Sequence, residues 1–138
     1  MVSGVNPTSE HTALFNELKI DRLHKCLIFD LIDKNSKLDC IFTGDKDFQW
    51  DSLQELLPKD DCRFVIYDFN YETDENPPRP ENKLLAILWA PETAKVKRRV
   101  PFSTSFNGLK SAFTGLQKDV QASDWSYLEY KSVRELCL

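Results

Sequence analysis

LWAPETAKVKRRVPFSTSFNGLKSAFTG, residues 88–115, is the stretch that decides the fold, because it joins an apolar run to a basic run and then to an amphipathic pattern. The basic run consists of Lys95, Lys97, Arg98 and Arg99. Three hydroxyl residues follow at 103–105, and such residues can accept hydrogen bonds from the free N–H groups that begin a helix. Beyond them, apolar residues recur at helical spacing: Phe106, Leu109, Ala112, Phe113 and Leu116. We therefore expect a helix that begins near Ser105, with cations directly before its N-terminus.

Strand patterns flank this stretch. Apolar, β-rich runs occupy residues 25–32, 38–42, 64–71 and 84–90. Turn residues between the first two runs predict a hairpin. The fourth run is apolar throughout, as expected for a central strand buried on both faces. The acidic, proline-rich segment 72–82 predicts a projecting hairpin loop, since prolines resist strand pairing.

Helical patterns complete the chain. They run from Asn6-Pro7 to Lys19, from Phe48 to Leu57 and from Tyr127 to Leu138. His11 lies on the first of these helices and is expected at its surface. The order of elements predicts one domain over residues 1–138, an α+β fold with a central mixed β-sheet flanked by helices on both faces.

Composition limits the possible function. The chain has 138 residues and a net charge of -4, which argues against nucleic-acid binding because that requires broad positive surface. The four cysteines form no CxxC pair, and the chain has only two histidines, so we expect no metal site. We expect the cysteines to be free thiols, which are typical of a reducing, cytoplasmic compartment. No apolar run is long enough to span a membrane, and the N-terminus lacks a secretion signal. No cofactor loop or catalytic motif is present, so we expect no enzyme activity and no cofactor.

Three further motifs share one resemblance with the opening stretch. They are Ser3-Gly4, the segment Asp61 to Phe69 (DCRFVIYDF), and Tyr130 to Val133. Together they resemble the actin-depolymerising factor/cofilin family. Within the opening stretch the positions in register are Trp89, Pro91, Glu92, Ala94, Val96, Lys97, Arg99, Phe102, Ser103, Thr104, Ser105, Leu109, Lys110, Phe113 and Gly115.

The resemblance implies the actin-depolymerising factor homology fold, which is gelsolin-like. It also implies a monomeric, cytoplasmic protein of the actin cytoskeleton that binds actin monomers, preferably in the ADP form, and promotes filament disassembly by severing and subunit loss. The implied monomer-binding residues are Ser3, Gly4, Val5, Lys95, Lys97, Arg98, Arg99, Leu109, Lys110 and Thr114. The implied filament-binding residues are Arg79, Lys83 and Glu135. Phosphorylation of Ser3 is the implied regulatory switch, since a phosphate would repel an acidic actin surface.

Departures from the family pattern predict weaker filament binding. The loop at 72–82 is acidic where the family is richer in Lys and Arg, and Leu136 replaces a usual cation. In the predicted partner-facing helix, Phe106 replaces the usual lysine and Ser111 a second cation. Phe106 could be an exposed anchor or a core residue. Gly108 replaces the usual alanine and could mark a kink.

Three further hypotheses remain open from the sequence. Phosphoinositide headgroups could bind the cations of Lys95 to Arg99 in competition with actin. The chain could also be a module of the same fold that binds anionic lipids or a regulator and has little depolymerising activity. A cysteine-dependent enzyme built on Cys62 is the remotest reading, because no base is evident near that thiol.

Overall fold

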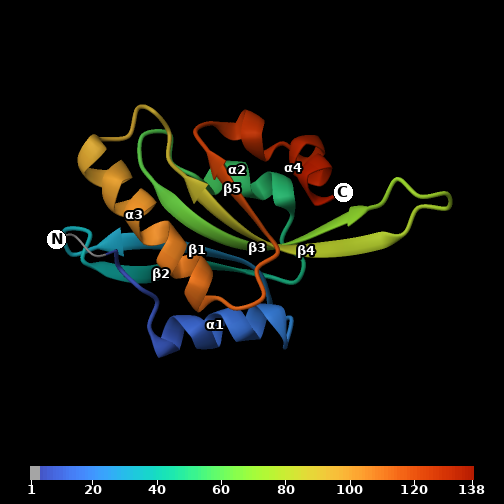
Figure 1. Cartoon of the computed structure of the whole chain (residues 1–138), viewed down its shortest axis with the longest axis horizontal. Helices are drawn as coiled ribbons and strands as arrows, with labels where there is room; N and C mark the ends of the chain where they lie inside the picture. Colours follow the sequence, from blue (N-terminus) through green and yellow to red (C-terminus); the bar gives the residue numbers. More distant parts are fainter. Residues whose placement is uncertain (1–3) are drawn as a thin grey trace.

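Five strands form one mixed sheet in the order β2-β1-β3-β4-β5 (Figure 1). The computed structural model describes residues 4–138, so Ser3 and its predicted role lie outside the described residues. The strands are β1 (His24–Ile32), β2 (Lys37–Asp45), β3 (Arg63–Glu72), β4 (Pro80–Trp89) and β5 (Lys118–Ala122). The first four strands pair antiparallel, and β5 pairs parallel to β4 after a helical crossover. The expected first hairpin and the buried central strand are both confirmed.

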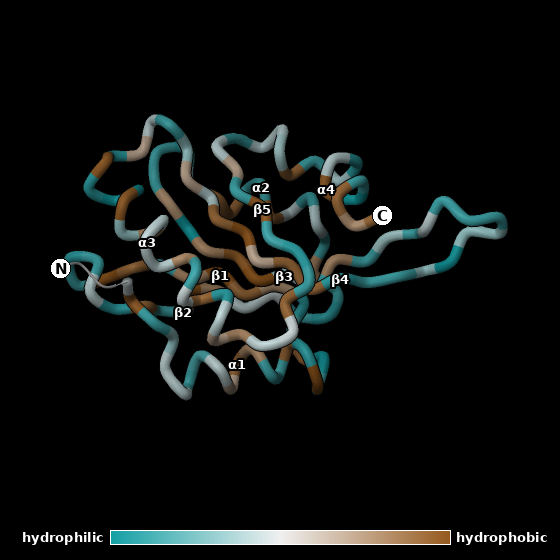
Figure 2. Tube along the Cα trace, viewed as in Figure 1, coloured by the Kyte–Doolittle hydropathy of each residue, from teal (hydrophilic) through white to brown (hydrophobic). Residues whose placement is uncertain are grey.

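Helices cover both faces of this sheet, as the sequence predicts. One face carries α1 (Ser9–Lys19) and α3 (Val96–Ala112), whose phenylalanines and leucines pack with the inward residues of β1, β3 and β4. The other face carries α2 (Leu53–Leu56) and α4 (Tyr130–Cys137), each preceded by a short 3-10 helix, Trp50–Ser52 and Trp125–Leu128. Figure 2 shows the hydrophobic strands enclosed between these two layers. The α+β prediction is therefore confirmed.

Two shorter elements differ from the sequence prediction. The expected helix over residues 48–57 is only one 3-10 turn and one α-helical turn. Its apolar pattern predicts four inward residues, Trp50, Leu53, Leu56 and Leu57, and all of them except the exposed Leu56 are buried. The β3–β4 hairpin projects beyond the sheet as expected (Figure 1), but its strands remain paired as far as Glu72 and Pro80. Strand pairing therefore shortens the loop to residues 73–79.

The prediction that His11 lies at the surface is wrong. Its side chain is only 9% exposed, and its ring packs edge-on against Phe29 at 5.7 Å. The Thr8 N–H donates a hydrogen bond to His11 Nδ1 at 3.0 Å, which satisfies a free donor at the start of α1. Burial lowers the pKa of His11 despite the carboxylates of Asp39 and Glu10. His11 is therefore part of the helix cap and core.

The prediction that the long helix begins near Ser105 is also wrong. α3 begins at Val96, so the basic run forms its first turn and Pro101 lies inside it. A proline has no N–H, which leaves the carbonyl of Lys97 without its helical donor. The side chain of Asn35, in the turn between β1 and β2, donates to that carbonyl at 3.2 Å. A contact from another part of the chain therefore lets the helix continue past Pro101.

Cations in the first turn of a helix are unfavourable, because the N-terminal end of the helix dipole is positive. The Arg98 cluster offsets this cost. Its members are Arg98, Asp30, Asp61, Arg63 and Asn35. Arg98 Nη2 lies 2.7 Å from Asp30 Oδ1, Arg98 Nε lies 2.9 Å from Asp61 Oδ1, and Arg98 Nη1 donates to the Leu31 carbonyl. The cluster therefore fastens the start of α3 to β1 and to the start of β3.

This cluster predicts a specific loss of stability in acid. Partial burial acts to raise the pKa of the Asp61 carboxyl, but hydrogen bonds from Arg98, the Cys62 N–H and Arg63 lower it overall from 3.8 to about 2. Since the pKa in the folded state lies below the unfolded value, the carboxylate stabilises the fold above about pH 4, and this contribution disappears as the pH falls towards 2. We expect urea unfolding, measured from neutral pH down to about pH 2, to show that Asp61→Asn is less stable than wild type near neutral pH. Below about pH 4 the free energy of unfolding of the variant should fall less steeply than that of wild type.

The matched control is Asp47→Asn, at an exposed loop carboxylate, which should follow the wild-type pH dependence. If the free energy of unfolding fell equally steeply with pH in Asp61→Asn and in wild type, the stabilising role of the Asp61 carboxylate would be contradicted.

Candidate surface for a protein partner

The outer face of α3 is a continuous stripe of exposed side chains. It consists of Lys97, Val100, Thr104, Asn107 and Ser111, spaced alternately by three and four residues. The opposite side of the helix, with Phe102, Ser105, Phe106 and Leu109, is buried against the sheet. The helix therefore presents one face to solvent along its whole length.

Two predicted residues fall on the buried side. Leu109 is 1% exposed and belongs to the core, so its prediction as a monomer-binding residue is wrong: a partner could not reach it. Phe106 is 2% exposed and stacks on Phe64 at 6.0 Å, which makes it a core residue rather than an exposed anchor.

The basic run divides into exposed and internal cations. Lys95 and Lys97 are exposed, and neither ammonium has an ion-pair partner within residues 4–138. Arg98 is committed to its cluster, so the expectation that it is available to a partner is corrected. Arg99 is half-buried, and its Nε has no hydrogen-bond partner among the described residues. Lys95 and Lys97 are thus the cations best placed to meet an acidic partner.

The end of the same helix holds two more predicted residues. Lys110 Nζ lies 3.3 Å from Asp119 Oδ2 and 4.6 Å from the centre of the Phe106 ring, so its charge is partly screened. Thr114 is exposed just beyond the helix, and its carbonyl accepts a hydrogen bond from Lys19 at 2.8 Å. Both residues remain at the surface where a partner can reach them.

The predicted N-terminal residues Gly4 and Val5 lie against the middle of α3. The Val5 N–H donates to Ser105 Oγ at 2.8 Å. Gly4 and Val5 also line a small cavity of about 170 Å³ with Lys34, Pro101 and Thr104. The structure therefore brings together the N-terminal segment and α3, which are far apart in sequence. Ser105 was not predicted as a contact, and its hydroxyl among apolar helical neighbours is the only local signal for such a role.

The predicted filament-binding residues gather at the other end of the molecule. Arg79 pairs with Glu75 and, at 3.1 Å, with Glu81, so its charge is neutralised within the hairpin. Arg79 and Lys83 line a cavity of about 550 Å³ with Cys137 and Leu138 at the end of α4. Glu135 is exposed on α4.

α4 is tied to this hairpin by its own basic residue. Arg134 Nη2 lies 2.6 Å from Asp74 Oδ1, and Arg134 Nε donates to the Glu72 carbonyl at 2.9 Å. The Tyr71 hydroxyl also donates to the Cys137 carbonyl. The hairpin and α4 therefore form one rigid region whose arginines are largely paired with acidic groups.

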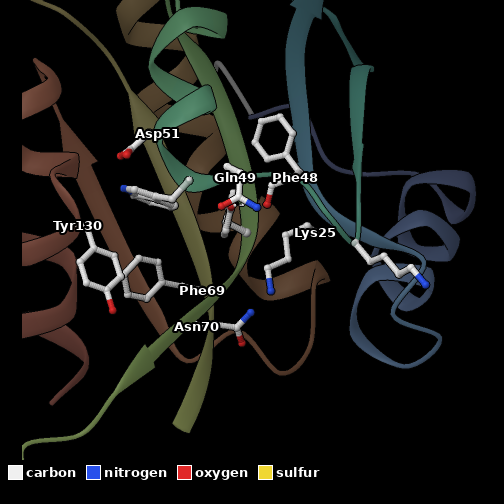
Figure 3. A pocket seen from close by; sticks show the side chains of 10 residues that line it. Lys25, Phe48, Gln49, Asp51, Phe69, Asn70 and Tyr130 are labelled. Carbon is white, nitrogen blue, oxygen red and sulfur yellow. Dashed lines mark hydrogen bonds between the residues drawn. The ribbon is translucent and has the colours of Figure 1, made fainter.

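A further cavity lies apart from these surfaces. A cavity of about 420 Å³, drawn in Figure 3, is lined by Lys25, Phe69 and Tyr130 among others, and contains none of the predicted site residues. Within the described part of the chain, no group of three potential metal ligands occurs, and no helix is long and apolar enough to cross a membrane. Apart from Leu109 and Arg98, the predicted site residues among 4–138 lie at or near the surface.

The cysteines do not form a reactive centre. All four are free, as the sequence predicts, and three of them are buried. Burial raises the pKa of the Cys62 thiol to about 11, although Arg98 and Arg99 oppose the shift. A thiol with so high a pKa is a poor nucleophile near neutral pH, which disfavours the cysteine-dependent reading.

Comparison with known proteins assigns the family. The sequence profile of the cofilin/tropomyosin-type actin-binding proteins matches residues 4–137. The chain belongs to this family. It is 35% identical to cofilin of Saccharomyces cerevisiae over 133 residues, which cover 96% of this chain and 92% of the relative. It is 33% identical to actin-depolymerizing factor 3 of Zea mays, covering 96% of this chain and 94% of the relative.

Solved structures agree with this assignment. Cofilin of Streptomyces griseoflavus superposes with a TM-score of 0.85 at 29% identity, covering 96% of each chain. Actin depolymerization factor 2 of Plasmodium berghei superposes with a TM-score of 0.83, and at 23% identity this likeness concerns the fold alone. The family fold expected from the sequence motifs is therefore confirmed.

Proposed function

We propose that this protein binds actin monomers and promotes the disassembly and turnover of actin filaments. One observation carries the proposal: the profile of a family of actin-binding proteins matches residues 4–137. The exposed outer face of the long helix α3 supports it. A helix whose face is free can enter a groove on a partner. The protein acts by binding alone, as a monomer in the cytoplasm, and its four free cysteines agree with a reducing compartment.

The monomer-binding surface combines the outer face of α3 with the N-terminal segment. Lys95 and Lys97 supply unpaired positive charge, while Val96 and Val100 supply exposed apolar surface beside them. Such charges accelerate encounter with an acidic partner, and the apolar groups add contact area. This surface is extended by Lys110, Thr114 and Arg99. Its preferred partner is the ADP form of the actin monomer. Phosphorylation of Ser3 would weaken binding, because a phosphate adds negative charge to a protein whose partner is acidic.

The filament-binding surface is weaker by this proposal. A protein that promotes filament disassembly must bind some filament states more tightly than others. The β3–β4 hairpin and α4 would supply part of that binding energy. Arg79 and Arg134 are each paired with acidic residues of the hairpin, which leaves Lys83 as its least neutralised cation. Electrostatic attraction of this region to an acidic filament surface is therefore small, and severing is correspondingly weak.

A second candidate function rests on the same exposed cations. Lys95 and Lys97, with Val96 and Val100 beside them, form a basic and apolar surface that could bind phosphoinositide headgroups in a membrane. Lipid and actin would then compete for one site. A module that binds only lipid would leave actin disassembly unchanged when added to filaments.

The first prediction concerns the monomer site. Removing both ammonium groups in Lys95→Ala/Lys97→Ala should weaken actin-monomer binding about tenfold, equivalent to about 1.4 kcal/mol, and should reduce its salt dependence. Fluorescence titration of labelled actin monomers at two salt concentrations measures both effects. Lys37→Ala, at an exposed position on β2, is the control. Unaltered affinity of the double variant would favour the lipid-binding alternative.

A second prediction concerns the filament site. Glu75→Lys/Glu81→Lys releases Arg79 from its partners and makes the hairpin basic. The affinity for actin filaments, measured by co-sedimentation, should therefore rise about tenfold, while the affinity for actin monomers is unaltered. Asp21→Lys/Asp39→Lys makes the same change in net charge at exposed positions away from the hairpin and should not increase it. Robust pelleting of the wild-type protein, or no gain in the hairpin variant, would contradict weak filament binding.

A further inference from the structure

The N-terminal segment is held on α3 by three neighbouring contacts. The Val5 N–H donates to Ser105 Oγ at 2.8 Å, Gly4 packs on the backbone of Thr104 and Ser105, and the Asn6 carboxamide lies over Gly108. These contacts follow the helix over little more than one turn. The segment therefore has a defined position beside the outer face of α3.

Ser105 makes an unusual use of its hydroxyl. A serine inside a helix commonly bonds back to a carbonyl of the preceding turn. Ser105 is 2% exposed, and its oxygen accepts a hydrogen bond from an amide 100 residues earlier in the sequence. A buried polar group on the core side of a helix requires such a partner. The Ser105 hydroxyl and the Val5 amide thus satisfy each other.

Close approach requires a glycine at position 4, and at position 108 it leaves room for a side chain. A Cβ on Gly4 would lie 2.8 Å from the Thr104 carbonyl oxygen and 2.9 Å from Ser105 Cα, and these backbone atoms cannot move aside. A Cβ on Gly108 would lie 2.3 Å from Asn6 Oδ1. A Cβ at position 108 would therefore make the Asn6 side chain rotate away, while the backbone contact at Gly4 leaves no room for a Cβ.

We propose that Ser105 is a positioning residue for actin binding. It fastens residues 4–6 to α3, so that the N-terminal segment and the outer face of α3 form one continuous surface before the partner arrives. This inference rests on the proposed function. Binding then avoids the entropic cost of ordering the segment, which a free segment would have to meet. Gly108 serves the same end by leaving space for Asn6.

A double-mutant cycle tests whether Ser105 acts through the segment. Ser105→Ala removes the acceptor, and Val5→Pro removes the donor while keeping the segment. Each variant should weaken actin-monomer binding about fivefold, the value of one hydrogen bond, and the pair together should lose no more than either alone. Ser132→Ala, at a half-buried serine of α4, is the control and should bind as wild type.

Two measurements separate positioning from loss of folding. The Val5 amide should exchange its hydrogen faster in Ser105→Ala than in wild type, as followed by NMR in the absence of actin. Gly108→Ala should displace Asn6 and weaken actin binding while its melting temperature is no lower than that of wild type, since alanine favours helix. A destabilised α3 would lower the melting temperature and the affinity together.

Additive losses in the cycle, or wild-type exchange of the Val5 amide in Ser105→Ala, would overturn the inference. Absence of actin binding by the wild-type protein would instead overturn the proposed function. The exchange measurement would in that case still show whether Ser105 fastens the segment.

Discussion

The guanidinium of Arg98 is the contact on which the placement of α3 depends. The helix starts with several cations, has no side-chain cap and contains a proline, and each of these features is unfavourable by itself. Asp30 and Asp61 neutralise the charge, and Asn35 supplies the donor that Pro101 lacks. Because these partners come from β1, from the turn after it and from the start of β3, the sheet itself holds the helix. The outer face of α3 therefore has a position that is fixed by contacts with the sheet.

This anchoring separates two kinds of cation. Arg98 serves the fold, while Lys95 and Lys97, which both precede it, have exposed side chains available to a partner. At the opposite end of the molecule the arginines of the hairpin and α4 are used internally, through Glu75, Glu81 and Asp74. The distribution of unpaired charge, more than the number of basic residues, is the reason for our proposal that the protein favours actin monomers over filaments.

Local sequence patterns predicted the sheet well, because the apolar runs that form β1, β3 and β4 are set by burial alone. They failed at the start of α3, where Pro101 and the hydroxyl residues after it are typical of a helix beginning. The donor from Asn35 that lets the helix continue lies 62 residues away, so no local pattern contains it. His11 was misplaced for a similar reason, since Phe29 of a later strand covers it. Leu109 shows the limit of motif transfer: its helical spacing indicated the core, and the resemblance assigned it to the partner surface.

Cross-saturation NMR on the isotope-labelled protein bound to unlabelled actin monomers tests the central claim most directly, because it reports which residues lie at the interface. We expect the largest signal losses at Gly4 and Val5 and along the outer face of α3, at Lys97, Val100, Thr104, Asn107 and Ser111. Little loss is expected at Lys25 and Asn70, around the cavity of Figure 3. Losses centred on that cavity or on the β3–β4 hairpin, with the outer face of α3 unaffected, would contradict it.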